Sequence, residues 1–224
     1  MSYASLTHPN AAELTEHYAS SAERRADKLV HLIGMAVSAA IGTSLFATAL
    51  YHCDPSIAGG IALYLLCTLV MLACSALYNL AQPSSARRLL RRLDETAIFA
   101  MIAGTCTPYL LKLPSHQWEA QGLEWSMAAA GAVGKVLAPR LRNHVWTVFY
   151  VAFGAVSLLL MGPSGASLPF ASLVCLAAVV ATYCVGLWVF LNDSLPYRRA
   201  MWHALIVIAA AVDFGALATG LVYA

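Results

Sequence analysis

The chain has 224 residues, of which 60% are hydrophobic and only 11% are charged, and its mean hydropathy is +0.70. Soluble domains carry about 25% charged residues, so this composition excludes an ordinary water-soluble domain and predicts one compact membrane domain. The formal charge of +2 comes from short basic clusters beside apolar stretches, a pattern that excludes a nucleic-acid partner. Six cysteines without a CxxC pair indicate apolar packing residues, not a disulfide scaffold or a thiolate zinc site.

Residues 1–28 form a polar N-terminal segment, in which Asn10 and Glu13 resemble a capping box. We expect a short helix from about Ala11 that lies at the membrane surface or stays loose. The domain 29–224 contains seven apolar stretches, most of them close to the roughly 20 residues that a membrane-crossing helix needs. The predicted helices are Leu29–Tyr51, Ile57–Asn79, Glu95–Leu111, Ala120–Leu137, Val145–Met161, Leu168–Leu191 and Ala200–Val222. Pro108 is expected to bend the third helix without ending it.

The basic residues of the connecting segments test this division, because cytoplasmic loops of membrane proteins are enriched in Lys and Arg. Twelve of the thirteen basic residues fall in the N-terminal segment and in the second, fourth and sixth connections, against Lys112 alone in the others. The alternation predicts an all-α bundle of seven transmembrane helices with a cytoplasmic N-terminus and the C-terminus outside.

Four predicted helices then carry polar residues at their cytoplasmic ends. The first brings Asp27 and His31, the second Ser75 and Asn79, the third Asp94, and the seventh Arg199 and His203. Three of these sets are i,i+4 pairs, and each such pair shares one helix face. The common depth predicts a polar cluster just beneath the inner headgroups.

Each of these residues also has a purely structural interpretation. Asp27 and His31 fit headgroup contacts, Ser75 fits a bond to its own helix backbone, and Asp94 fits an N-cap. Arg199 fits a topology determinant that reaches the surface, and His203 fits a packed histidine. Asp213 lies ten residues beyond His203, about 15 Å deeper. It must pair, stay protonated or face a wet cavity.

The sequence resembles the haemolysin III branch of the progestin and adipoQ receptor family. The matching stretches are Ala26–Gly34, Ser75–Asn79, Leu93–Asp94 through Ile102–Pro108, and Tyr197–His203. The resemblance implies a seven-helix bundle that holds zinc with three histidines, at positions that here are Asn79, Arg199 and His203. It implies supporting roles for Ser75 and Asp94, and a polar position at Asp213.

Only His203 of the three implied ligands is present, so zinc in the family's geometry is not expected. Asparagine is a poor zinc ligand and arginine has no lone pair to donate, whereas a catalytic zinc site needs about three protein ligands. We expect instead an ion pair between Arg199 and Asp94, with Asn79 and His203 hydrogen-bonded around it.

The resemblance implies a hydrolase acting on a lipid amide such as a ceramide, with Ser75, Asp94 and His203 as catalytic residues and His203 as the retained metal ligand. A non-catalytic, metal-free lipid-binding or receptor-like bundle is the alternative that Asn79 and Arg199 favour. A transporter or proton-linked channel using Asp213 and His203 is the third. The expected partner is a membrane lipid, and the expected location is a bacterial-type cytoplasmic (inner) membrane.

Overall fold

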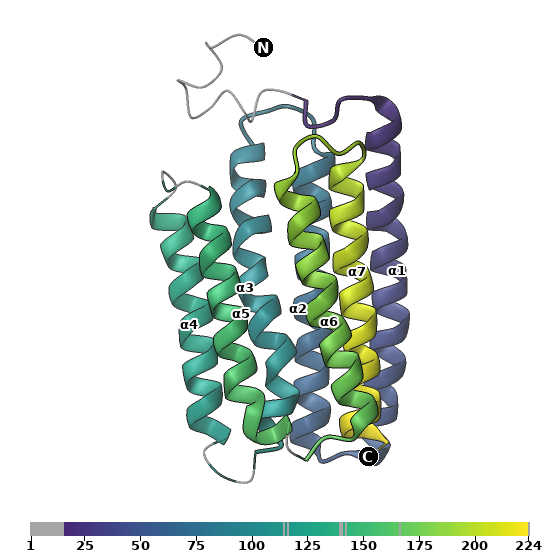
Figure 1. The fold of residues 1–224 in the computed structure, drawn as a ribbon, viewed down its shortest axis with the longest axis vertical. Helices are drawn as coiled ribbons and strands as arrows, with labels where there is room; N and C mark the ends of the chain where they lie inside the picture. Colours follow the sequence, from purple (N-terminus) through teal and green to yellow (C-terminus); the bar gives the residue numbers. More distant parts are fainter. Residues whose placement is uncertain are drawn as a thin grey trace.

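The computed structural model describes residues 16–223 except 114, 116, 139, 140, 142 and 166, and it is a bundle of long helices running side by side (Figure 1). The helices are α1 (Ser21–His52), α2 (Pro55–Leu80), α3 (Arg87–Leu111), α4 (Gln117–Leu137), α5 (Asn143–Gly165), α6 (Phe170–Leu191) and α7 (Arg198–Leu217), and a π-helical turn, η3 (Ala218–Val222), follows α7. The predicted all-α class with seven helices is confirmed.

Five helices, α1, α2, α5, α6 and α7, are long and apolar enough to cross a membrane. Two helices begin eight residues earlier than the hydropathy pattern predicted, α1 at Ser21 and α3 at Arg87, whereas the other starts lie within three residues of the prediction. Their first turns are charged, and apolar patterning detects only the part of a helix that hydrocarbon surrounds. Pro108 lies inside α3, which continues to Leu111, so this proline does not end the helix.

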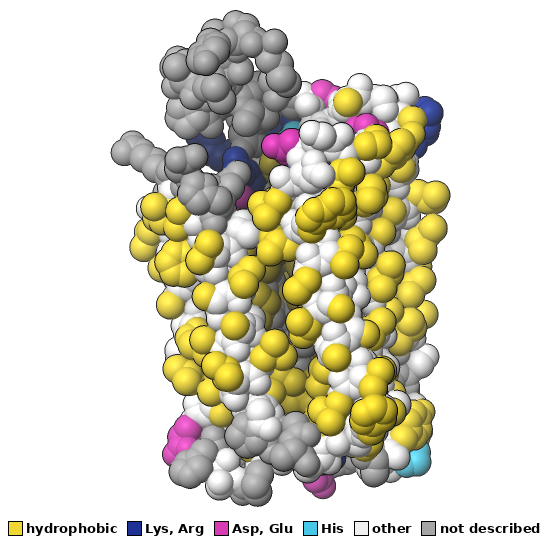
Figure 2. Space-filling view, in the orientation of Figure 1, with side chains coloured by type: hydrophobic (Ala, Val, Ile, Leu, Met, Phe, Trp, Pro, Cys, Tyr) yellow, Lys and Arg dark blue, Asp and Glu magenta, His cyan; other side chains and the backbone are white. Residues whose placement is uncertain are grey.

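The site-bearing helices pack together in the core of the bundle. α1 contacts α2 and α7, α2 contacts α3, and α6 packs against α7, whereas α4 and α5 join the bundle mainly through α3. Apolar side chains cover the flank of the bundle in Figure 2, and basic side chains gather at the end where α1 begins. The start of α1 and the end of α7 lie at opposite ends of the bundle (Figure 1), as an odd number of crossings requires.

Residues 16–20 do not stay loose at the membrane surface. Ser20 caps α1 by accepting a hydrogen bond from the Glu23 backbone, and Glu23 in turn accepts one from the Ala19 backbone. Arg24 donates to the carbonyl oxygen of Leu80 at the end of α2 (2.7 Å). Tyr18 is buried. The predicted helix from Ala11 falls mostly outside the described residues, and residues 16–20 are not helical.

Close contact between α1 and α7 depends on two glycines of α1. A Cβ atom on Gly34 would lie 2.4 Å from Cγ2 of Val207, and one on Gly42 would lie 3.0 Å from the Phe214 ring. Small residues let membrane helices approach closely. Gly34 is one turn from His31, and Val207 is one turn from His203, so this contact sets the distance between the polar residues of the two helices.

We expect Gly34→Ala to lower the midpoint of thermal unfolding of the protein in detergent. Alanine favours a helix by about 1 kcal/mol over glycine, but the added methyl group must displace the stiff Val207 side chain, and overpacking of this kind costs about 1–3 kcal/mol. The matched control is Gly122→Ala on α4, where a Cβ atom meets nothing within 4 Å and the midpoint should hold or rise. An unchanged midpoint for Gly34→Ala would contradict the close contact.

Candidate functional site

Asp27 is the centre of a buried polar cluster at the start of α1. Its side chain is fully buried, and its two carboxylate oxygens take different partners. The Tyr18 hydroxyl donates to Oδ2 at 2.5 Å, and the ring nitrogen Nδ1 of His203 lies 2.6 Å from Oδ1. An ionised carboxylate only accepts hydrogen bonds, so both neighbours are donors. Three parts of the chain therefore meet at one carboxylate.

This contact decides the tautomer of His203. A proton on Nδ1 that is donated to Asp27 leaves Nε2 of the neutral ring as an acceptor. The Ser75 hydroxyl on α2 lies 3.4 Å from that Nε2. Ser75, His203 and Asp27 thus form a line of hydroxyl, imidazole and carboxylate from three helices, in which the carboxylate orients the ring and the ring faces the hydroxyl.

His31 completes a group that is able to hold a metal ion. It follows Asp27 by one helical turn, its Nε2 lies 3.5 Å from Asp27 Oδ2, and its ring centre lies 4.4 Å from that of His203. One ligand atom each from Asp27, His31 and His203 lie within 4.8 Å of one another, and all three residues are buried. Neither His31 ring nitrogen has a hydrogen-bond partner among the described residues. The Nε2 atom has only its 3.5 Å contact with Asp27, and a buried imidazole that lacks hydrogen bonds is costly unless something else binds it.

Arg199 bonds to Asn79 and not to Asp94, so the expected ion pair is wrong. The guanidinium donates to Asn79 Oδ1 at 2.9 Å, and the Asn79 amide nitrogen donates to the Ser75 carbonyl oxygen (3.0 Å) and hydroxyl (3.3 Å). Asn79 accepts the hydrogen bond with an amide oxygen that a histidine would lack. The two substituted positions therefore link α2 to α7 directly and hold the backbone next to Ser75.

Asp94 on α3 lies beside this cluster. Its carboxyl group interacts with the Ser75 hydroxyl and with the charges of His31 and Arg199, but no ion pair with Arg199 forms within the described part of the chain. The structure thus brings Ser75, Asp94 and His203 to one place together with Asp27, His31, Asn79 and Arg199. Asp213 lies apart from them, deeper along α7.

The contact of Tyr18 with Asp27, and the grouping of Asp27 and His31 with His203 as residues able to hold a metal, are the features that sequence reasoning missed. Burial and the bond to Asp27 raise the pKa of the Tyr18 hydroxyl well above its ordinary value, so it remains a donor. Burial and nearby arginines lower the pKa of the adjacent His17 to about 3, so it stays neutral. The i,i+4 spacing of Asp27 and His31 at the depth of His203 was the available signal for the ligand set. Nothing in the sequence marked Tyr18.

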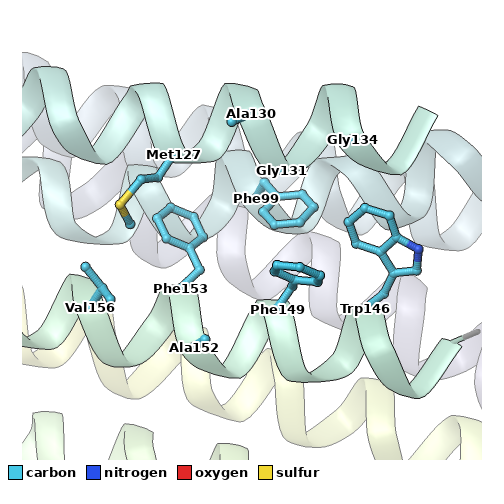
Figure 3. A pocket seen from close by; sticks show the side chains of 10 residues that line it. All are labelled: Phe99, Met127, Ala130, Gly131, Gly134, Trp146, Phe149, Ala152, Phe153 and Val156. Carbon is cyan, nitrogen blue, oxygen red and sulfur yellow. The ribbon is translucent and has the colours of Figure 1, made fainter. Parts of the chain in front are cut away.

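An apolar cavity of about 400 Å³ lies away from the cluster, between α4 and α5. In Figure 3 the rings of Trp146, Phe149 and Phe153 on α5 face Met127 and Gly131 on α4, with Phe99 of α3 beside them. Its lining offers no ionisable side chain. The cavity can accept hydrocarbon, but it holds none of the groups that hydrolysis needs.

Comparison with known proteins places the chain in a family. The model of the family described as "Haemolysin-III related" matches residues 26–214, which is most of the chain. The chain belongs to the haemolysin-III related family. Hemolysin-3 of Bacillus cereus is 26% identical over 194 residues, covering 86% of this chain and 89% of that protein. The Hemolysin-3 homolog of Bacillus subtilis (strain 168) is 26% identical over 65% of this chain and 69% of its own length.

A relative in animals extends the similarity. The human monocyte to macrophage differentiation factor is 28% identical over 131 residues, covering 55% of this chain and 52% of that protein. No solved structure matches the chain. This haemolysin-III related chain is therefore a multi-pass membrane protein.

The zinc that the family resemblance implies does not fit its expected ligands here, but it fits a neighbouring set. Arg199 and Asn79 bond to each other, and neither supplies a nitrogen lone pair for zinc. Asp27, His31 and His203 supply a carboxylate and two imidazoles, an accepted ligand set for catalytic zinc that leaves a fourth position open. The structural observation that favours this set is that neither ring nitrogen of the buried His31 makes a hydrogen bond within the described residues.

Tyr18→Phe is expected to lower the free energy of unfolding by about 1–3 kcal/mol, because the variant removes the hydroxyl that bonds to a fully buried carboxylate. Thermal unfolding in detergent measures the loss. Tyr51→Phe removes a hydroxyl from an 87% exposed side chain and is the matched control with no expected change. Equal midpoints for the two variants would contradict a stabilising hydrogen bond between Tyr18 and Asp27.

Proposed function

We propose that this protein is a metal-dependent hydrolase of the cytoplasmic (inner) membrane that cleaves an amide bond of a membrane lipid. The observation that carries the proposal is the convergence of Asp27, His31 and His203, buried and within 4.8 Å of one another by their ligand atoms. Zinc is the metal that such a ligand set fits best. A metal bound there lowers the pKa of a coordinated water and polarises a substrate carbonyl.

The residues around the ligands have separate tasks in this proposal. Tyr18 holds Asp27 in place by donating to Oδ2, which leaves Oδ1 for the metal side of the cluster. His203 would bind through Nδ1 in its other neutral tautomer, with the ring proton moved to Nε2, where the Ser75 hydroxyl lies 3.4 Å away. Ser75 faces the other nitrogen of His203 and positions water or the substrate carbonyl. Asp94 lies next to Ser75. It would accept the proton that the attacking water loses and return it to the leaving nitrogen of the amide.

The assignment of a lipid amide as the substrate rests on the family resemblance and on the position of the site in the bundle. The cluster is at the end of the bundle where α1, α3 and α7 begin, and the basic residues Arg24, Arg87 and Arg199 lie at that end. In this proposal that end lies at the level at which the headgroup of a lipid meets its acyl chain. An amide that joins a headgroup base to a fatty acid lies at that level. The apolar flank of the helices (Figure 2) brings such a lipid to the protein without passage through water.

A metal-free lipid-binding bundle is the second candidate, and one observation favours it. Both oxygens of Asp27 already accept hydrogen bonds, from Tyr18 and from His203, so the carboxylate is satisfied without a cation. In that case Asp27 and His203 serve to link α1 to α7. The two candidates differ in one measurable property, the metal content of the folded protein.

Purified protein is expected to contain about one zinc ion per chain, and His31→Ala is expected to lose it. His31 is the matched choice because its ring nitrogens make no hydrogen bond within the described residues and only a 3.5 Å contact with Asp27. Loss of the buried ring also lowers stability, so the zinc content is measured on variant protein that is shown to be folded. The control is His52→Ala at the exposed far end of α1. Metal analysis by mass spectrometry measures the content, and folded protein that stays metal-free after zinc addition would favour the second candidate.

Hydrolysis of a short-chain ceramide in lipid nanodiscs is the matching activity measurement. Ser75→Ala is expected to lower kcat by about 10–100-fold with the zinc content unchanged, because Ser75 acts next to a ligand and is not one. His203→Ala is expected to lose both zinc and activity. Normal turnover by His203→Ala would rule out the proposed site.

A further inference from the structure

A second buried polar group lies deeper in the bundle, around Asp213 of α7. Asp213 is 1% exposed, and neither of its carboxylate oxygens has a hydrogen-bond partner within the described residues. No Lys, Arg or His side chain of those residues forms an ion pair with it. An unpaired carboxylate inside a membrane bundle is costly, so Asp213 either holds a proton or has its charge compensated by another group.

Two hydroxyl groups of α2 lie near this carboxylate. Tyr64 and Thr68 are one helical turn apart, both side chains are completely buried, and both hydroxyls lack hydrogen-bond partners among the described residues. The Tyr64 hydroxyl nevertheless lies close enough to interact with both Thr68 and Asp213, and its ring stacks on Phe214 at 4.8 Å. The three side chains therefore converge without bonding to one another.

Two further tyrosines line the same region. Tyr183 of α6 and Tyr109 of α3 interact electrostatically with Asp213, and Tyr183 also donates weakly to the Met101 sulfur. Tyrosines of α2, α3 and α6 therefore lie within electrostatic range of the carboxylate. The group contains oxygen atoms and no nitrogen ligand, a donor set that hard cations prefer and transition metals do not.

We propose that Asp213, Tyr64 and Thr68 form a binding site for a small monovalent cation such as Na⁺. One monovalent cation neutralises one carboxylate, whereas a divalent ion leaves a net positive charge in a low-dielectric interior. A proton on Asp213 satisfies one oxygen only. A cation between the groups satisfies both carboxylate oxygens and the two hydroxyl oxygens together. The site is separate from the Asp27 cluster, and it does not depend on the proposed hydrolase activity.

Sodium-dependent stability of the full-length protein tests the site. We expect the midpoint of thermal unfolding to rise with the logarithm of NaCl concentration when choline chloride holds the ionic strength constant, because a ligand that binds only the folded state stabilises it. Asp213→Asn should remove this dependence, since the amide carries no charge to compensate. Asp54→Asn, in the exposed α1–α2 connection, should retain the full dependence.

Thr68→Val is the second variant, because it removes one oxygen at nearly constant volume and keeps Asp213. It should shift the sodium dependence to several-fold higher concentration, and it serves also if Asp213→Asn fails to fold. Direct binding of radioactive Na⁺ to the purified protein should be lost in Asp213→Asn and weakened in Thr68→Val. Equal midpoints in NaCl and choline chloride, without Na⁺ binding, would overturn the proposal and leave Asp213 protonated and hydrated.

Discussion

The hydrogen bond between Asp27 and His203 is the interaction on which the site depends. It joins α1 to α7, the first helix of the bundle to the last, at 2.6 Å between two buried side chains. Removal of either partner leaves a polar group without compensation in an apolar interior, where the cost is several times that at a surface. The bond also fixes the His203 proton on Nδ1. It thereby leaves Nε2 as the acceptor that faces the Ser75 hydroxyl.

The same bond explains why the substituted ligand positions are tolerated. In the geometry that the family resemblance implies, α2 and α7 are linked through a shared metal. Here the Arg199–Asn79 hydrogen bond supplies that link, and the α1–α7 link runs through Asp27. A charged group that bonds to a neutral amide holds the helices in register without a metal. His203 then faces α1, where a second histidine and a carboxylate are available.

Sequence patterning predicted the helices well and the site only in part. Apolar stretches and loop charges are repeated along the whole chain, so seven helices could be counted even though charged first turns hid the true starts of α1 and α3. The four site-bearing helices were also predicted, because i,i+4 spacing fixes which residues share a face. The partner of Arg199 was not, since periodicity gives the depth of a side chain and not the direction in which a long guanidinium reaches. The role of Tyr18 was not predicted for a related reason. It precedes α1, and its burial depends on how a non-helical segment folds back over the bundle.

The two polar groups of α7 illustrate how depth determines chemistry. His203 lies at the end of the bundle among nitrogen and carboxylate ligands, a set that suits a transition metal and a reacting water. Asp213 lies about 15 Å further in, within electrostatic range of tyrosines from α2, α3 and α6. Both groups are buried, and Asp213 is the more enclosed of the two, 1% exposed against 8% for His203. The group around His203 is the one for which we propose turnover, and the group around Asp213 is the one for which we propose a bound cation. One helix carries both because α7 buries residues along its whole length, from Ala200 to Leu217.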